Sequence, residues 1–178
     1  MSFFVEFLKN PRQNASAVPS SARASARMLE GLDLSKMKYV VELGPGTGCF
    51  TAQLMEKLPE SSEVLVLEIN PLYCQGLREK YGSRFHVRRS SAQLMDDMVD
   101  ELGWPRVDLI ISGLPFTLPD DVLDPLYQSI QRRTKTGTTY RFFTYIPPLM
   151  KRRNRQFKLT LEHTVLRNFP PMWIYSGV

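Results

Sequence analysis

Three glycines and a carboxylate are grouped in the stretch VVELGPGTGCF, residues 40–50. Glu42 lies near the end of an apolar run, and Gly44, Gly46 and Gly48 follow it before a segment with helical spacing. Glycines at such a turn let the backbone bend tightly and let a ligand approach the main chain. The spacing differs from the Gly-x-Gly-x-x-Gly of dinucleotide sites, and a nearby carboxylate disfavours a pyrophosphate. The stretch therefore predicts a site for a cationic ligand, with a plain strand-to-helix turn as the structural alternative.

A second carboxylate closes the next apolar run, VLVLEINP, where Glu68 is followed by Ile69. An acid at this strand end commonly accepts hydrogen bonds from both hydroxyls of an adenosine ribose. NAD and S-adenosylmethionine both carry that ribose, so Glu68 alone does not discriminate between them. Together with Glu42 and the glycine turn, Glu68 favours S-adenosylmethionine, whereas an exposed acid at a strand end is the structural alternative.

A third break follows the apolar run VDLIIS, where the chain continues as Gly113-Leu114-Pro115-Phe116. Ligands of open α/β sheets bind at the carboxyl ends of the strands, so we expect this break to lie beside the reacting group. Ser112 has no side-chain amide, so it cannot hydrogen-bond the amine of a planar nucleic-acid base as an asparagine at this position would. On the resemblance to amine methyltransferases that is set out below, Gly113 is expected to leave room for an amine on a flexible stem and Phe116 to face a methylated ammonium. The alternative is a purely structural strand-to-loop break.

An amine must lose its proton before it attacks a methyl group, and a carboxylate or a tyrosine can accept that proton. We rank Tyr145 first, because it ends the strand next to the break at Ser112. Asp120 and Asp121, which follow the break, are the other candidates, and each of these three residues can instead have a structural role.

Apolar β-rich runs alternate with helical spacing over most of the chain, which favours a parallel α/β sheet covered on both faces. The β-rich runs span 38–44, 63–69, 84–89, 107–112, 138–146, 162–169 and 172–177, and the helical stretches span 48–58, 71–81, 91–102 and 121–133. A Pro-Pro connection at 170–171 is too short for a parallel crossover, so the last two strands form an antiparallel hairpin. We predict a Rossmann-like sheet of seven strands over 36–178 and a helical extension over 1–35.

Positive charge is concentrated late in a chain of 178 residues with a net charge of +5. Ten Lys/Arg residues and a single acid, Glu162, occur from Arg132 onward. Such a surface attracts the phosphates of nucleic acid or of an anionic membrane, although a solvated basic loop is the alternative. The densest run follows Pro147-Pro148 and predicts a cationic loop with Lys151, Arg152, Arg153 and Arg155.

Aromatic residues on one face of a short N-terminal segment predict contact with lipid or with the core. Phe3, Phe4 and Phe7 share a helical face that can lie in a headgroup region. Ser20 and Ser21 either contact a lipid phosphate or cap the helix that begins near them. Two cysteines and two histidines give neither a disulfide framework nor a multi-histidine metal site, so we expect no metal and a reducing cytosol.

The stretches ELGPGTG and LEINP resemble motifs I and II of the class I S-adenosylmethionine-dependent methyltransferases. The resemblance implies that the three glycines line the methionine part of the cofactor, Glu42 lies near its amino end and Glu68 holds the ribose. The third strand of that family usually ends in Gly-Asp-Ala, whereas this chain has Ser90-Ser91-Ala92, so Ser91 takes the place of the aspartate beside the adenine.

Within that superfamily, the chain resembles the bacterial phospholipid N-methyltransferases over essentially its whole length. The segments that carry this resemblance are SFFVEFLKNPRQNASAVPSSARASARML, VVELGPGTG, ISGLPF, RFFTY and NFPPMWIY. It implies stepwise methylation of phosphatidylethanolamine toward phosphatidylcholine by a cytoplasmic enzyme held on the inner face of the membrane. We expect a monomer, with anionic membrane and phospholipid as its partners.

Two other functions are compatible with parts of the sequence. The related rRNA adenine dimethylases share ELGPGTG, but they carry Asn-Leu-Pro-Tyr or Asn-Pro-Pro-Tyr where this chain has Ser112-Gly113-Leu114-Pro115-Phe116. No separate C-terminal RNA-binding domain is visible, so the sequence does not favour nucleic acid. A non-catalytic protein of the same fold that binds anionic membrane or RNA is the third hypothesis.

Overall fold

The computed structural model describes residues 22–167 and 170–178, and these residues form a seven-stranded sheet in the order β3-β2-β1-β4-β5-β7-β6. The strands are β1 (Tyr39–Leu43), β2 (Glu63–Glu68), β3 (Phe85–Arg89), β4 (Leu109–Ser112), β5 (Thr139–Thr144), β6 (Leu159–Val165) and β7 (Met172–Gly177). The first five are parallel, and β7 is antiparallel to both β5 and β6. The predicted fold class is therefore confirmed.

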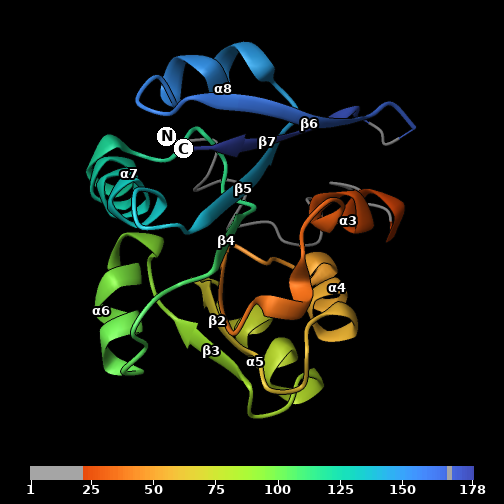
Figure 1. Ribbon diagram of the computed structural model, residues 1–178, viewed down its shortest axis with the longest axis vertical. Coiled ribbons are helices and arrows are strands. Elements are labelled where there is room, and N and C mark those ends of the chain that lie inside the picture. Colours follow the sequence, from red (N-terminus) through yellow and green to blue (C-terminus); the bar gives the residue numbers. More distant parts are fainter. Residues whose placement is uncertain (1–21, 168–169) are drawn as a thin grey trace.

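Helices cover both faces of this sheet (Figure 1). They are α3 (Ala22–Leu29), α4 (Cys49–Lys57), α5 (Pro71–Lys80), α6 (Met95–Glu101), α7 (Asp120–Thr134) and α8 (Pro147–Arg153), with short 3-10 turns η1 (Leu34–Lys36) and η2 (Ala92–Leu94). The core beneath α6, α7 and α8 contains Met95, Leu126 and Met150. The core on the other face contains Met28 of α3 and Leu54 of α4. Because apolar helices pack on both faces, β1, β2 and β4 are buried almost throughout.

The run after β5 forms a helix, so the predicted cationic loop is wrong for Lys151, Arg152 and Arg153. Pro147 and Pro148 occupy the first positions of α8, where a missing N–H leaves no helical hydrogen bond unmade. The carbonyl of Ile146 accepts the N–H of Met150 at 3.1 Å and starts the helix. The following strand, β6, also begins earlier than predicted, at Leu159.

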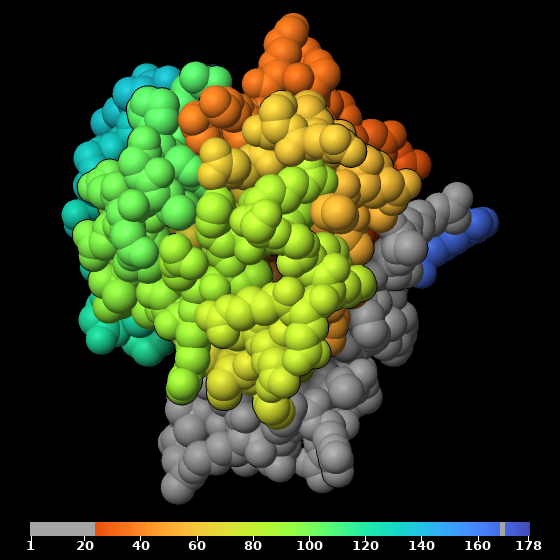
Figure 2. Space-filling model, turned by 90° about the horizontal axis from the view of Figure 1, so that it is seen from below, coloured from red at the N-terminus to blue at the C-terminus, as the bar shows by residue number. Residues whose placement is uncertain are grey.

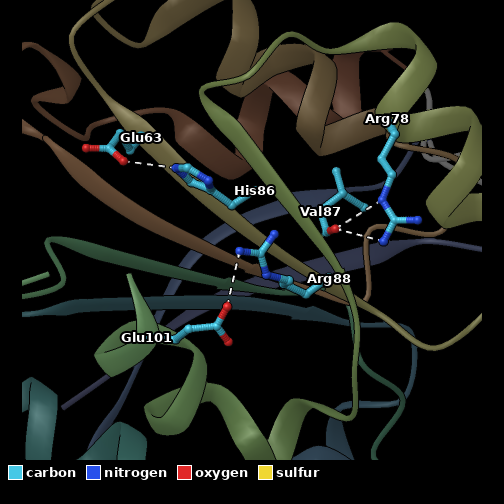
Figure 3. Close-up of polar contacts among 6 residues, drawn as sticks. All are labelled: Glu63, Arg78, His86, Val87, Arg88 and Glu101. Carbon is cyan, nitrogen blue, oxygen red and sulfur yellow. Dashed lines mark hydrogen bonds and ion pairs between the residues drawn. The ribbon is translucent and has the colours of Figure 1, made fainter. Parts of the chain in front are cut away.

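Charged side chains at one edge of the sheet and a shift in register at the other protect the sheet from further pairing. At the β3 edge, Arg78 of α5 donates two hydrogen bonds to the carbonyl of Val87, at 3.2 and 3.0 Å (Figure 3). Arg88, which lies in β3 beside Val87, forms an ion pair with Glu101 of α6, with 3.5 Å between Nη2 and Oε1 (Figure 3). Figure 2 shows the side of the molecule on which α5 and β3 lie. The other edge strand, β6, is interrupted by a shift in register between Leu161 and His163. Charges and irregular pairing both discourage addition of a further strand.

The predicted N-terminal extension has one described helix, α3, and this helix packs on the sheet. Ala24 and Met28 are fully buried in the same core as α4. Arg141 of β5 donates from Nη1 to the carbonyls of Met28 and Glu30, at 3.2 and 2.6 Å, and so holds the carboxyl end of α3. Among the described residues, no helix is both long and apolar enough to cross a membrane.

Candidate active site

Three loops meet where β1, β2 and β4 end. Leu43 of β1 is in register with Leu67 of β2 on one side and with Ser112 of β4 on the other. Beyond these pairs, the N–H of Gly44 donates to Leu67 at 2.9 Å, and the N–H of Gly113 donates to Leu43 at 2.8 Å. The strand order reverses between β1 and β4, which is where open α/β sheets bind ligands.

The glycine turn between β1 and α4 has a left-handed backbone at Gly44, Gly46 and Gly48, with φ of 66°, 56° and 83°. L side chains rarely adopt this conformation, so the glycines are required by the shape of the turn. A Cβ on Gly44 would lie 2.8 Å from Leu114, whereas a Cβ on Gly46 would meet no atom within 4 Å. The main chain at Gly46 is therefore open to a ligand.

Glu68 holds this turn beside the end of β2. Its Oε2 accepts the N–H of Gly46 at 3.2 Å, and its Oε1 accepts the N–H of Asn70 at 2.8 Å. The residue is 8% exposed, and Ile69 beside it is 37% exposed. A carboxylate offers about four acceptor sites, so two backbone donors leave capacity for ligand hydroxyls.

The end of β3 lies next to Glu68. The N–H of Ser90 donates to the carbonyl of Glu68 at 3.1 Å, which places Ser91 and Ala92 at the same edge of the sheet. Ser91 is partly exposed and Ala92 is buried. The segment thus lies where the adenine contact was predicted, although the role of Ser91 stays a prediction.

Glu42 is buried in β1 below the glycine turn, with 1% exposed. Its Oε2 accepts the hydroxyl of Thr51 at 2.8 Å, and its Oε1 has no hydrogen-bond partner among the described residues. Burial raises the pKa of Glu42 to about 8, against the opposing effect of the Thr51 hydrogen bond. A buried carboxyl oxygen without a partner is a group that a hydrogen-bonding ligand would satisfy, and a cationic ligand would favour the ionised form of Glu42.

The Ser112–Pro115 corner directly contacts the glycine turn, and this contact corrects the role expected for Gly113. A Cβ on Gly113 would lie 2.7 Å from the carbonyl oxygen of Gly44, so the glycine is needed for two backbones to approach and not to make room for an amine. Ser112 is 5% exposed, and its Oγ accepts the N–H of Leu114 at 3.3 Å. The hydroxyl therefore stabilises the turn.

The packing of Phe116 does not support the expectation that it faces the substrate, because its ring is 9% exposed and packs edge to face on Phe142, with 5.7 Å between the ring centroids. Phe143 and Tyr145, two residues apart at the end of β5, are only partly buried. Their centroids lie 5.3 Å apart, and Phe143 would lie 3.6 Å from a Cβ on Gly113. Sequence reasoning missed Phe143, although the period of two along β5 places it on the face of Tyr145.

Arg153 binds the loop that follows the Ser112–Pro115 corner, which corrects its assignment to a membrane-facing loop. Its guanidinium donates to the carbonyls of Phe116 and Leu118, each at 3.2 Å, and pairs with Asp120. Asp120 is thereby engaged in an ion pair. Lys151, Arg152 and Arg155 are exposed, as a surface role requires. The other residues predicted to contact substrate or membrane, namely Phe3, Phe4, Phe7, Ser20 and Ser21, lie outside the described residues.

The arrangement fits S-adenosylmethionine on the features of this structure. Gly46 offers open main chain, Glu68 has acceptor capacity at the neighbouring strand end, and Glu42 has a buried oxygen without a partner. These residues would hold the methionine part, the ribose and the cationic end, respectively. The Ser112–Pro115 corner lies directly beside them.

Comparisons with known proteins relate the chain to methyltransferases. No protein-family model matches it. The ornithine lipid N-methyltransferase of Singulisphaera acidiphila is 28% identical over 178 residues, a match that covers 97% of this chain and 92% of the relative. The ribosomal RNA small subunit methyltransferase A of Cupriavidus necator is 33% identical over 85 residues, a match that covers 47% of this chain and 29% of that relative.

Solved structures show the same fold at low sequence identity. A SAM dependent methyltransferase from Aquifex aeolicus has a TM-score of 0.63 at 11% identity and covers 93% of this chain and 96% of its own. A precorrin-6y C5,15-methyltransferase from Geobacter metallireducens has a TM-score of 0.64 at 14% identity, with 88% and 87% covered. The comparisons support a methyltransferase with S-adenosylmethionine as its cofactor.

Replacing the buried carboxyl in Glu42→Gln should increase stability more at pH 8 than at pH 5. The pKa of Glu42 is about 8 in the folded chain and 4.5 as the ordinary value. Between these two values the folded chain therefore keeps a proton on Glu42 that the unfolded chain has released. The contribution of Glu42 to stability is full below about pH 4.5 and is lost as the pH rises toward 8. A neutral amide removes this loss.

Urea unfolding at several pH values measures the effect. The free energy of unfolding of the variant, relative to the original chain, should grow by roughly 1–3 kcal/mol from pH 5 to pH 8. Glu79→Gln, at an exposed residue of α5, is the matched control and should show no such trend. A difference for Glu42→Gln that stays constant with pH would contradict the assignment.

Proposed function

We propose that this protein transfers methyl groups from S-adenosylmethionine to the amine of a membrane lipid, with phosphatidylethanolamine as the substrate. The observation that carries the proposal is the contact between the glycine turn and the Ser112–Pro115 corner. Similarity to a lipid N-methyltransferase along 97% of the chain supports the lipid amine. Phosphatidylethanolamine rests on the family resemblance of the sequence.

The chain's own residues would bind and orient the reactants. When bound, the cofactor supplies a methyl group on a sulfonium, which carries its own driving force. The protein then needs chiefly to align an amine with that methyl. Glu68 and the glycine turn would hold one reactant, while the corner and the half-buried rings of Phe143 and Tyr145 would border the other. Partial exposure of these rings at the end of β5 supports this position.

The amine must be neutral to attack, so a group at the site has to accept its proton. Tyr145 is our choice, because it follows β5 beside the corner. Asp120 is a weaker candidate than the sequence suggested, since Arg153 already pairs with it. As the amine gains methyl groups it becomes a better partner for an aromatic face, and Phe143 takes over the role first expected of Phe116.

The place of action that we propose is the cytoplasmic face of the membrane, with the protein as a peripheral monomer that produces phosphatidylcholine by successive transfers. Exposed cations on α8 support attraction to anionic lipid. An RNA substrate is less well supported. The match to the ribosomal RNA methyltransferase of Cupriavidus necator covers 29% of that relative. Ser112 lacks the side-chain amide that would hydrogen-bond a base, and the ring of Phe116 packs in the core.

Loss of the Glu68 carboxylate should weaken cofactor binding. Because Glu68 holds Gly46 and offers acceptors to the ribose, Glu68→Ala should raise the Kd for S-adenosylmethionine by about 10- to 100-fold, the effect of losing charge-assisted hydrogen bonds. Isothermal titration calorimetry measures this, and Glu79→Ala serves as the control at an exposed acid of α5. Unchanged affinity in Glu68→Ala would remove Glu68 from the site.

Methyl transfer to vesicles tests the proposed function itself. Purified protein with labelled cofactor should label phosphatidylethanolamine in vesicles that also contain anionic lipid. Parallel reactions contain ornithine lipid or ribosomal RNA in place of phosphatidylethanolamine. Label in ornithine lipid alone would retain lipid N-methylation and correct the substrate. Label in RNA alone, or no transfer although the cofactor binds, would overturn the proposal.

A further inference from the structure

Two large aliphatic side chains project into solvent at the end of the sheet that carries the site. Ile146 is 58% exposed and Leu166 is 72% exposed. Ile146 directly follows the aromatic pair of β5, and Leu166 directly follows β6. Both views show the described end of the β6–β7 hairpin, in blue, projecting from the body of the protein (Figures 1 and 2).

The strand register places these side chains at one edge. Thr144 of β5 is in register with Trp173 of β7, and Trp173 is in register with Thr164 of β6. Ile146 and Leu166 each lie two residues beyond this row, one on each side of Met172, the first residue of β7. They therefore extend past the sheet in the same direction as the glycine turn and the corner, which also follow strand carboxyl ends.

The exposure of Ile146 is built into the backbone. Its N–H donates to the hydroxyl of Thr144 at 2.9 Å, and its carbonyl accepts the N–H of Met150 at 3.1 Å. Two prolines follow and restrict the chain further. Leu166 follows the last ladder pair, between Val165 and Met172. Ile146 is therefore held outward by hydrogen bonds on both sides, and Leu166 is set beyond the last rung of the ladder.

Positive charge accompanies this apolar pair. Arg167 is exposed next to Leu166, and α8, which begins directly after Ile146, exposes Lys151 and Arg152. From residue 125 to the end of the sequence the sole acid is Glu162, whose carboxylate lies 3.7 Å from the buried guanidinium of Arg141. Apolar side chains flanked by cations match the interface of an anionic bilayer, where acyl chains lie below phosphates.

We propose that Ile146 and Leu166, with Arg167, Lys151 and Arg152, form a membrane-docking corner that inserts into the headgroup region of an anionic bilayer. The inference rests on the proposed lipid function and adds where the membrane is contacted. Docking at this corner would turn the carboxyl edge of the sheet toward the bilayer. A lipid amine could then reach Phe143 and Tyr145 while its acyl chains stay in the membrane.

The test compares serine variants in a vesicle flotation assay with vesicles of phosphatidylglycerol and phosphatidylcholine. The double variant Ile146→Ser/Leu166→Ser should bind at least about 10-fold more weakly than the original chain, because it loses both aliphatic groups that would be buried in the bilayer. The matched control is Val178→Ser, at 66% exposure beyond the opposite end of β7, which faces away from the carboxyl edge of the sheet. This variant should bind normally, and thermal unfolding checks that every variant is folded.

Methyl transfer separates this inference from the proposed function. The double variant should lose transfer to vesicle lipid but keep transfer to a short-chain, water-soluble phosphatidylethanolamine. Normal vesicle binding by the double variant would overturn the docking corner, and so would an equal loss in Val178→Ser. If the original chain binds vesicles, the double variant does not, and no lipid is methylated, then the proposed function fails and the docking corner stands.

Discussion

The contact between Gly113 and Gly44 is the constraint on which the site depends. A Cβ on Gly113 would lie 2.7 Å from the carbonyl oxygen of Gly44, a distance that backbone atoms cannot relieve without movement of one loop. The backbone of Gly113 is not in the left-handed region, so space alone requires the glycine. At this point the loop after β1, proposed to bind the cofactor, directly contacts the loop after β4, proposed to border the methyl acceptor.

Other features of the fold keep that contact in place. Leu114 packs over Gly44, and Phe116 is anchored in the core against Phe142. Arg153 of α8 ties down the loop that follows by bonding two of its carbonyls. Helix α8 therefore has two roles: Arg153 holds the loop that follows the Ser112–Pro115 corner, and Lys151 and Arg152 place positive charge on the surface. A substitution at Arg153 would disturb both, whereas Lys151 and Arg152 report on the surface alone.

Much of the sheet and the meeting of the glycine turn with Glu68 could be predicted from the sequence, because their patterns are local. Glycine spacing, an acid at each of two strand ends and alternating apolar runs all act within a few residues. The errors lie where distant segments meet. No local pattern shows that the empty side of Gly113 is filled by Gly44, or that Phe116 packs in the core while Phe143 stays partly exposed near Gly113. Likewise Pro147-Pro148 suggested a loop, although two prolines also suit the first turn of a helix.

The most direct measurement is methyl transfer by Gly113→Ala, compared with Gly82→Ala, at a position where a Cβ meets nothing within 4 Å. If the two loops must touch, Gly113→Ala should stay folded but lose transfer to phosphatidylethanolamine by about 100-fold, since small misplacements of reactants cost rates of that order. Gly82→Ala should be unaffected. Transfer by Gly113→Ala at the rate of the original chain would contradict the account.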